Sequence, residues 1–141
     1  MRLDLLIILV GVATTYGGPT DPNYFDGAPL YCDRDGTKLY SPHTEPWVAV
    51  DVSHYENGSV RCGDKLLIRF ANGAELRALA LDAGYLSRHW TVDYPHVPIV
   101  VDVPAHLAPF QGVTPARVLN LSALRRGFEQ RRLERMELNG I

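Results

Sequence analysis

Short apolar runs separated by turn residues dominate the hydrophobic pattern of this 141-residue chain. Four of these runs are rich in Val, Ile and Leu, as strands are: WVAVDVS, KLLIRFA, VPIVVDV and ARVLNL. Asn72-Gly73 lies between KLLIRFA and AELRALALDAG, and Asp35-Gly36 lies between LYC and TKLY, which are patterns typical of short β-hairpins. Six or so short strands with long loops and little helix predict a small β-barrel or sandwich in a single domain.

The two ends of the chain depart from this pattern. At the N-terminus, the apolar run from Leu5 to Ala13 imitates a secretion signal cleaved after Ala13, but it equally suits a buried strand. The run is too short to cross a bilayer as a helix, which needs about 20 residues, so no stable membrane span is expected.

At the other end, SALRRGFEQRRLERMEL predicts a helix with Ser122 as its N-cap and Asn139-Gly140 as its stop. Arginines offset by glutamates at helical spacing are typical of a solvated helix. The alternative is an arm that contacts a protein partner or an anionic surface.

Charge and cysteine content narrow the function classes. With 14 Lys plus Arg against 16 Asp plus Glu, the chain has a formal net charge of -2, so no global positive field recruits nucleic acid. Cys32 and Cys62 would close a loop of about 31 residues and stabilise the fold by roughly 3 to 4 kcal/mol if bridged. Two unpaired buried thiols are the alternative. Neither cysteine belongs to a CxxC or Cys/His cluster, so we expect no metal or other cofactor.

Three aspartates follow apolar strand residues: Asp51 in WVAVDVS, Asp82 in LALDAGY and Asp102 in IVVDVPA. A carboxyl group that emerges from a buried strand loses hydration, and its pKa can rise towards the range of a general acid. Cleavage of a glycosidic bond needs such a proton donor. The alternative is that these side chains only cap turns.

Aromatic and basic residues gather in the loop from residue 85 to 98. Such rings could stack against sugars, or could simply cover the end of a barrel. The candidate substrate-binding residues are Tyr16, Tyr85, Arg88, Trp90 and Tyr94.

Six segments, taken in order, resemble the six-stranded double-psi β-barrel of expansins, rare lipoprotein A-like proteins and lytic transglycosylases. These segments are TTYGG, LYCDRDG, WVAVDVS, RCGDKLLIRF, LALDAG and VVDVPAHLAPFQGVTPARV. Thr14 to Gly17 match the Thr-Trp-Tyr-Gly of an expansin first strand except for the Trp. Asp102 corresponds to the Asp of the expansin His-Phe-Asp motif. The series Asp51, Asp82-Ala-Gly and Asp102 is also similar to the three-aspartate domain of bacterial wall lytic enzymes. The resemblance covers about residues 12–121.

The resemblance divides the chain into an apolar segment (1–13), a double-psi β-barrel (14–121) and a C-terminal Arg-rich helix (122–141). It implies a polysaccharide groove with Asp102 as the proton donor and Asp82 as its neighbour. Asp51 fits the three-aspartate pattern, whereas rare lipoprotein A-like proteins have a His there.

Gly18 occupies the place where family-45 endoglucanases carry the Asp that activates water. An inverting hydrolase needs such a second carboxylate about 6.5 to 9.5 Å from the acid, so the resemblance disfavours inverting hydrolysis. A lytic transglycosylase needs no base for water, because the 6-hydroxyl of muramic acid closes an anhydro ring.

We therefore expect a secreted or periplasmic cell-envelope protein that cleaves peptidoglycan as a lytic transglycosylase does, with Asp102 as acid and base. One alternative is a non-catalytic, expansin-like module that binds or loosens the wall polymer. Another is a structural subunit of an extracellular or viral assembly, in which the N-terminal segment and the C-terminal helix contact neighbours.

Overall fold

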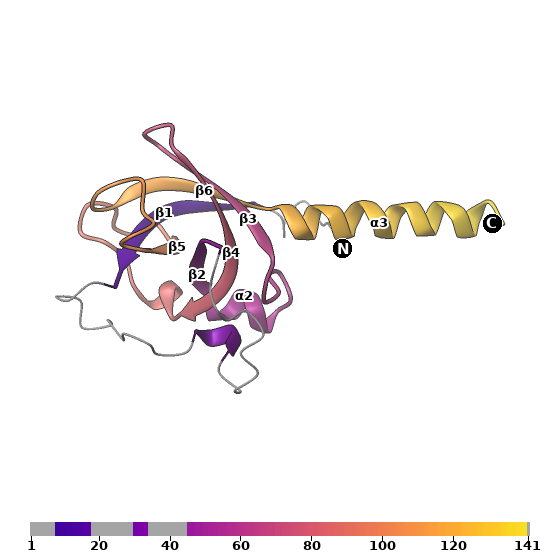
Figure 1. The fold of residues 1–141 in the computed structure, drawn as a ribbon, viewed down its shortest axis with the longest axis horizontal. Helices are drawn as coiled ribbons and strands as arrows, with labels where there is room; N and C mark the ends of the chain where they lie inside the picture. Colours follow the sequence, from indigo (N-terminus) through magenta and orange to yellow (C-terminus); the bar gives the residue numbers. More distant parts are fainter. Residues whose placement is uncertain (1–7, 18–29, 34–44, 141) are drawn as a thin grey trace.

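The computed structural model describes residues 8–17, 30–33 and 45–140. Within these residues, six strands close into a barrel in the order β1-β5-β2-β4-β3-β6, and one long helix follows them (Figure 1). The strands are β1 (Ile8–Tyr16), β2 (Trp47–Asp51), β3 (Lys65–Phe70), β4 (Glu75–Gly84), β5 (Ile99–Pro104) and β6 (Thr114–Asn120). The helical elements are η1 (Tyr31–Asp33), α2 (Val52–Glu56), η2 (Leu86–Arg88) and α3 (Leu121–Leu138). The predicted six-stranded barrel with a C-terminal helix is confirmed.

Two local predictions can be checked directly. The apolar N-terminal run forms strand β1 from Ile8 onward. At the Asn72-Gly73 turn, which joins β3 to β4, the Gly73 N–H donates to the Phe70 carbonyl at 2.9 Å, and Gly73 has a φ of 87° that favours glycine. The predicted Asp35-Gly36 hairpin lies outside the described residues.

The strand pairing has a two-fold pattern. β1 is parallel to β5 and β2 is parallel to β4, whereas the other four neighbouring pairs are antiparallel. Exchanging β1 with β4, β2 with β5 and β3 with β6 reproduces every pair and its direction. The first three strands and the last three are therefore equivalent halves. They meet where Ala49 of β2 lies opposite Asp102 of β5.

Alternation along the strands decides which side chains fill the barrel. Val48 and Val50 of β2 and Val101 and Val103 of β5 are fully buried in the core. Because neighbouring side chains of a strand point to opposite faces, the residues between these valines, including Asp102, lie on the outer side. The chemistry-bearing residues of β2 and β5 are therefore held by a rigid apolar core without being part of it.

The predicted disulfide is present. Cys32 in η1 bonds Cys62 just before β3, with Cα atoms 5.7 Å apart and a sequence separation of 30. Constraining a loop of this length stabilises a fold by roughly 3 to 4 kcal/mol in the chain-entropy model. The bond also holds η1 against the barrel, where the Tyr31 N–H donates to Asp82 Oδ1 at 3.1 Å.

Helix α3 begins two residues earlier than the sequence pattern predicts. Asn120, and not Ser122, is its N-cap, because Asn120 Oδ1 accepts from the Ala123 N–H at 3.0 Å. Ser122 Oγ instead accepts from the Lys65 N–H at 2.8 Å and so joins the helix to β3. The prediction missed this because Asn120 also ends strand β6, and its burial there is a tertiary property.

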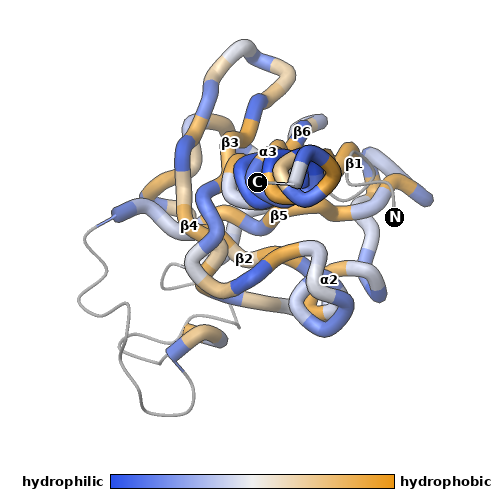
Figure 2. Tube along the Cα trace, turned by 90° about the vertical axis from the view of Figure 1, so that its right-hand side faces the viewer, coloured by the Kyte–Doolittle hydropathy of each residue, from blue (hydrophilic) through white to orange (hydrophobic). Residues whose placement is uncertain are grey.

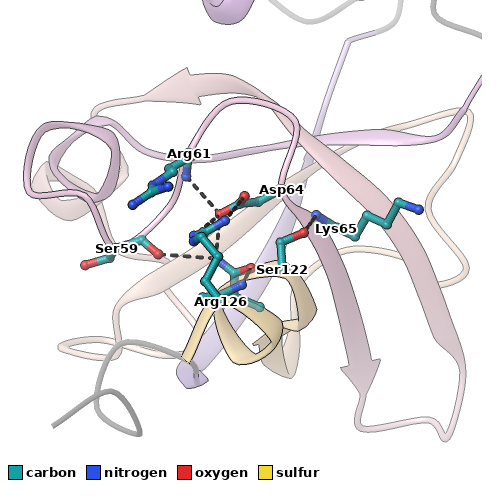
Figure 3. Close-up of polar contacts among 8 residues, drawn as sticks. Ser59, Arg61, Asp64, Lys65, Ser122 and Arg126 are labelled. Atoms are coloured by element: carbon teal, nitrogen blue, oxygen red, sulfur yellow. Dashed lines mark hydrogen bonds and ion pairs between the residues drawn. The ribbon is translucent and has the colours of Figure 1, made fainter. Parts of the chain in front are cut away.

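An ion pair between buried Asp64 and half-buried Arg126 anchors the root of α3 to the barrel (Figure 3). Arg126 donates two hydrogen bonds to the Asp64 carboxylate, at 2.7 and 3.0 Å. Asn120 Nδ2 and the Arg61 N–H also donate to Asp64 Oδ2, each at 2.9 Å. Burial alone would raise the pKa of Asp64, but the bonds from Arg126, Asn120 and Arg61 outweigh it and hold that pKa below its usual value.

Beyond this anchor, α3 projects away from the barrel (Figure 1), and Figure 2 views the helix nearly end-on in front of the strands. Ala123 and Gly127 are its buried residues. The Arg125–Glu129 pair at 3.3 Å and the Gln130–Glu134 hydrogen bond at 3.1 Å, each between residues four apart, support the projecting turns.

The anchor predicts how stability varies with pH. The pKa of folded Asp64 lies below the unfolded value of about 3.9, so its ionised form stabilises the fold above that pH. This contribution is lost as the pH falls through the folded pKa. We expect Asp64→Asn to lower the free energy of unfolding at pH 7 by roughly 2 to 3 kcal/mol and to flatten its decline below pH 4. Urea unfolding from pH 2 to 7 measures both.

Asp93→Asn, which changes an exposed aspartate, is the matched control for this experiment. An Asp64→Asn variant that keeps the wild-type dependence on pH would show that the anchor does not set it.

Candidate functional site

Two of the three predicted aspartates lie in one row across the barrel. Ala49 of β2 is in register with Asp82 of β4 on one side and with Asp102 of β5 on the other. Thr14 of β1 continues the row beyond Asp102. Two strand spacings separate the Cα atoms of the aspartates by roughly 10 Å. Ala49 adds only a methyl group to the space between them.

Irregular pairing next to this row sets the direction of its side chains. The register shifts between Val12 and Ala13 of β1 and between Val48 and Ala49 of β2. On β4, Ala80 and Leu81 are both buried although they are consecutive, and Asp82 follows them half-buried. Since an extra residue in a strand redirects the side chains that follow, the shift on β4 brings Asp82 to the outer face.

Tyr16 joins β1 to this row. Its hydroxyl donates to Asp82 Oδ2 at 2.8 Å, while the Tyr31 N–H binds Oδ1 of the same carboxylate. Burial raises the pKa of Tyr16 far above its usual value, and the charge of Asp82, the hydrogen bond to it and the charge of Asp102 add to this. Tyr16 therefore keeps its proton as a fixed donor, within electrostatic reach of both aspartates.

Asp102 has a different environment. Thr14 Oγ1 donates to Asp102 Oδ1 at 3.0 Å, and the Asp102 side chain is half-buried on the outer face of β5. A hydroxyl can either donate to a carboxylate or accept from a protonated carboxyl. Thr14 is thus a suitable partner for a group that gains and loses a proton.

Aromatic side chains lie near the row, and one group of them is found where β1 finishes and β2 begins. The Trp47 ring lies edge-on to Tyr16 at 6.0 Å, and His106 lies 6.4 Å from Trp47. Tyr31 and Tyr55 pack against each other at 4.9 Å, and the Tyr55 hydroxyl donates to the Asp82 carbonyl at 2.8 Å.

Four of these residues were not predicted from the sequence to belong to the site: Trp47, His106, Tyr31 and Tyr55. Trp47 alone had a usable signal, because it stands two residues before Ala49 and so shares its face.

Asp51, the third predicted aspartate, ends β2 and caps α2. Its carboxylate accepts from the Ser53 N–H, the Ser53 hydroxyl and the Ser87 N–H. Burial would raise the pKa of Asp51, but these bonds outweigh it and lower that pKa. Asp51 therefore joins α2 to η2. It is two residues along β2 from Ala49, on the side away from Trp47.

The predicted aromatic loop lies at that same end, between Gly84 of β4 and Ile99 of β5. Tyr85 and Trp90 are 59% and 64% exposed, so both present free ring surface. The Arg88 guanidinium lies over the Tyr85 ring at 4.6 Å. Trp90 stacks with His96, and Tyr94 packs against the cluster of Val12, Leu86 and Ile99. Of the predicted binding residues, the structure brings Tyr16 to the aspartates and places the other four at the opposite end.

No family model, curated protein or solved structure matches this chain. Within residues 8–17, 30–33 and 45–140, no three His, Cys, Asp or Glu side chains are grouped so as to hold a metal ion. No helix of the same residues is long and apolar enough to cross a membrane. The predictions on Gly18 fall outside the described residues.

The environment of Tyr16 gives a spectroscopic prediction. Because the pKa of Tyr16 is raised far above the usual value of about 10, this phenol should stay protonated up to pH 11. We expect Tyr16→Phe to leave the absorbance change at 295 nm up to pH 11 equal to that of the wild type. In urea, the absorbance change of the same variant should be smaller than that of the wild type by the contribution of one of the seven tyrosines. A smaller absorbance change in the folded variant than in the folded wild type would contradict the raised pKa of Tyr16.

Proposed function

We propose that this protein is a double-psi β-barrel that acts on cell-wall glycan, with peptidoglycan as its substrate and Asp102 as its acid and base. The observation that carries the proposal is the row in which Asp82 and Asp102 flank Ala49. The two equivalent three-strand halves, which each contribute one strand to both parallel pairs, support the barrel type.

The two carboxylates have separate parts in the proposed reaction. Asp82 has both oxygens engaged, by Tyr16 and by the Tyr31 N–H, so it acts as a fixed negative charge beside the sugar. Protonated Asp102 gives its proton to the glycosidic oxygen as the bond to C1 breaks. The 6-hydroxyl of the same muramic acid then bonds to C1 and returns a proton to Asp102. The products are an anhydro sugar and a free chain end, and no water is consumed.

The surrounding rings suit a sugar substrate. Trp47, beside Tyr16, offers an apolar ring and a hydrogen-bonding tip, which is how aromatic side chains hold sugar rings. His106 extends this surface. A disulfide is typical of oxidising compartments, which supports our proposal that the protein works outside the cytoplasm, in the periplasm or at the cell surface.

Incubation with purified peptidoglycan tests this function. We expect the wild type to release anhydromuramyl products, detected by mass spectrometry, and Asp102→Asn to lower their rate by at least about 100-fold, because general acid catalysis contributes that much. Asp93→Asn removes the same charge from an exposed residue and should release these products at the wild-type rate.

Equal rates for Asp102→Asn and the wild type would contradict the assigned acid. Binding to peptidoglycan without any product would favour the expansin-like, non-catalytic alternative.

The projecting helix supports a second candidate, a structural subunit of an extracellular or viral assembly. Phe128, Leu133 and Leu138 of α3 are 60%, 51% and 87% exposed, although large apolar side chains are usually covered. A rigid helix that carries such residues away from its own core is suited to packing against a neighbouring subunit.

This candidate predicts self-association through α3. We expect light scattering after size exclusion to show oligomers of the wild type at about 100 μM, and monomers when Leu133 and Leu138 are both changed to Glu. Gln130→Glu, on the same helix, is the control for added charge. A monomeric wild type would exclude this assembly.

A further inference from the structure

A cavity of about 330 Å³ lies where the root of α3 meets β3 and β4. This volume is at the lower end of the range for small-ligand pockets. Its lining combines an apolar floor with charged side chains. The apolar residues are Pro46, Leu66, Ala78, Leu79 and Leu121, and the charged ones are Glu45, Lys65 and Arg77.

The two cations of the cavity stand on the same outer face of the barrel. Lys65 of β3 is opposite Leu79 of β4, and Arg77 is two residues before Leu79 on the same strand. Such diagonal neighbours lie about 7 to 8 Å apart, so both long side chains can reach a single anion. Within the described part of the chain, neither cation forms a salt bridge. Lys65 and Arg77 carry two positive charges and Glu45 carries one negative charge, so the lining of the cavity has a net positive charge.

The cavity adjoins the row of the two aspartates. Trp47 of β2 is in register with Leu79, and Leu79 with Lys65. The pair of Ala49 and Asp82 lies two residues further along β2 and three further along β4. Two residues along a strand span about 7 Å. A substituent on a sugar bound at the aspartates therefore has a short path past Trp47 into the cavity.

We propose that this cavity binds a short apolar peptide, ending in a free carboxylate, that is attached to the glycan. The inference names the substrate class of the proposed site and so rests on the proposed function. The terminal carboxylate pairs with Lys65 and Arg77, and small apolar side chains lie on Leu79 and Leu121. Glu45 accepts from a peptide N–H. An unsubstituted neutral glycan offers no group for these cations.

Binding of N-acetyl-alanyl-alanine, compared with its C-terminal amide, tests the cavity by NMR titration. We expect the acid to bind at least about tenfold more tightly than the amide, since one charge-assisted contact supplies that difference. Arg77→Gln and Lys65→Gln should each weaken binding of the acid by about tenfold. Arg117→Gln removes an exposed positive charge from β6, outside the cavity, and should change nothing.

The inference is overturned if neither compound binds at millimolar concentration, if both bind equally, or if Arg117→Gln weakens binding as much as Arg77→Gln does. Peptidoglycan with and without its peptides separates this inference from the proposed function. Equal turnover of both polymers would reject the peptide subsite and keep the glycan reaction. Binding of the free acid without action on either polymer would keep the cavity and reject the reaction.

Discussion

Closure of the six strands into a ring is the constraint on which the other features depend. In a closed barrel every strand has two fixed neighbours, and a shift by one residue would turn the buried valines of β2 and β5 towards solvent. The register is therefore tightly specified. That register aligns Thr14, Asp102, Ala49 and Asp82, which come from four strands widely spaced in the chain. The candidate site is a consequence of barrel closure.

Buried and half-buried aspartates have different parts in this fold. Asp51 and Asp64 are almost fully buried, and hydrogen bonds stabilise the charge of each, so they join neighbouring elements. Asp82 and Asp102 are only half-buried and lie on the outer face. Their accessibility, together with the protonated Tyr16 nearby, is why the proposed chemistry is placed at these two aspartates.

The root of α3 connects the structural and the proposed functional parts. The Asp64–Arg126 pair and the Ser122–Lys65 hydrogen bond fix the first two turns of the helix against β3. The first of these turns supplies Leu121 to the cavity that also contains Lys65. The helix is thus a wall of the proposed peptide subsite as well as a projecting arm, and loss of the anchor would alter both.

The sequence by itself determined the strands, the Asn72-Gly73 turn, the C-terminal helix and three aspartates that follow apolar strand residues, because alternation and turn chemistry are local properties. It also indicated the cysteine pair that forms the disulfide. Only the tertiary structure decided that Asp82 and Asp102 share a row while Asp51 caps a helix. The same holds for Trp47, which joins Tyr16, and for the loop with Trp90, which lies at the other end. Pairing between distant strands sets these positions, and no local pattern in the chain records it.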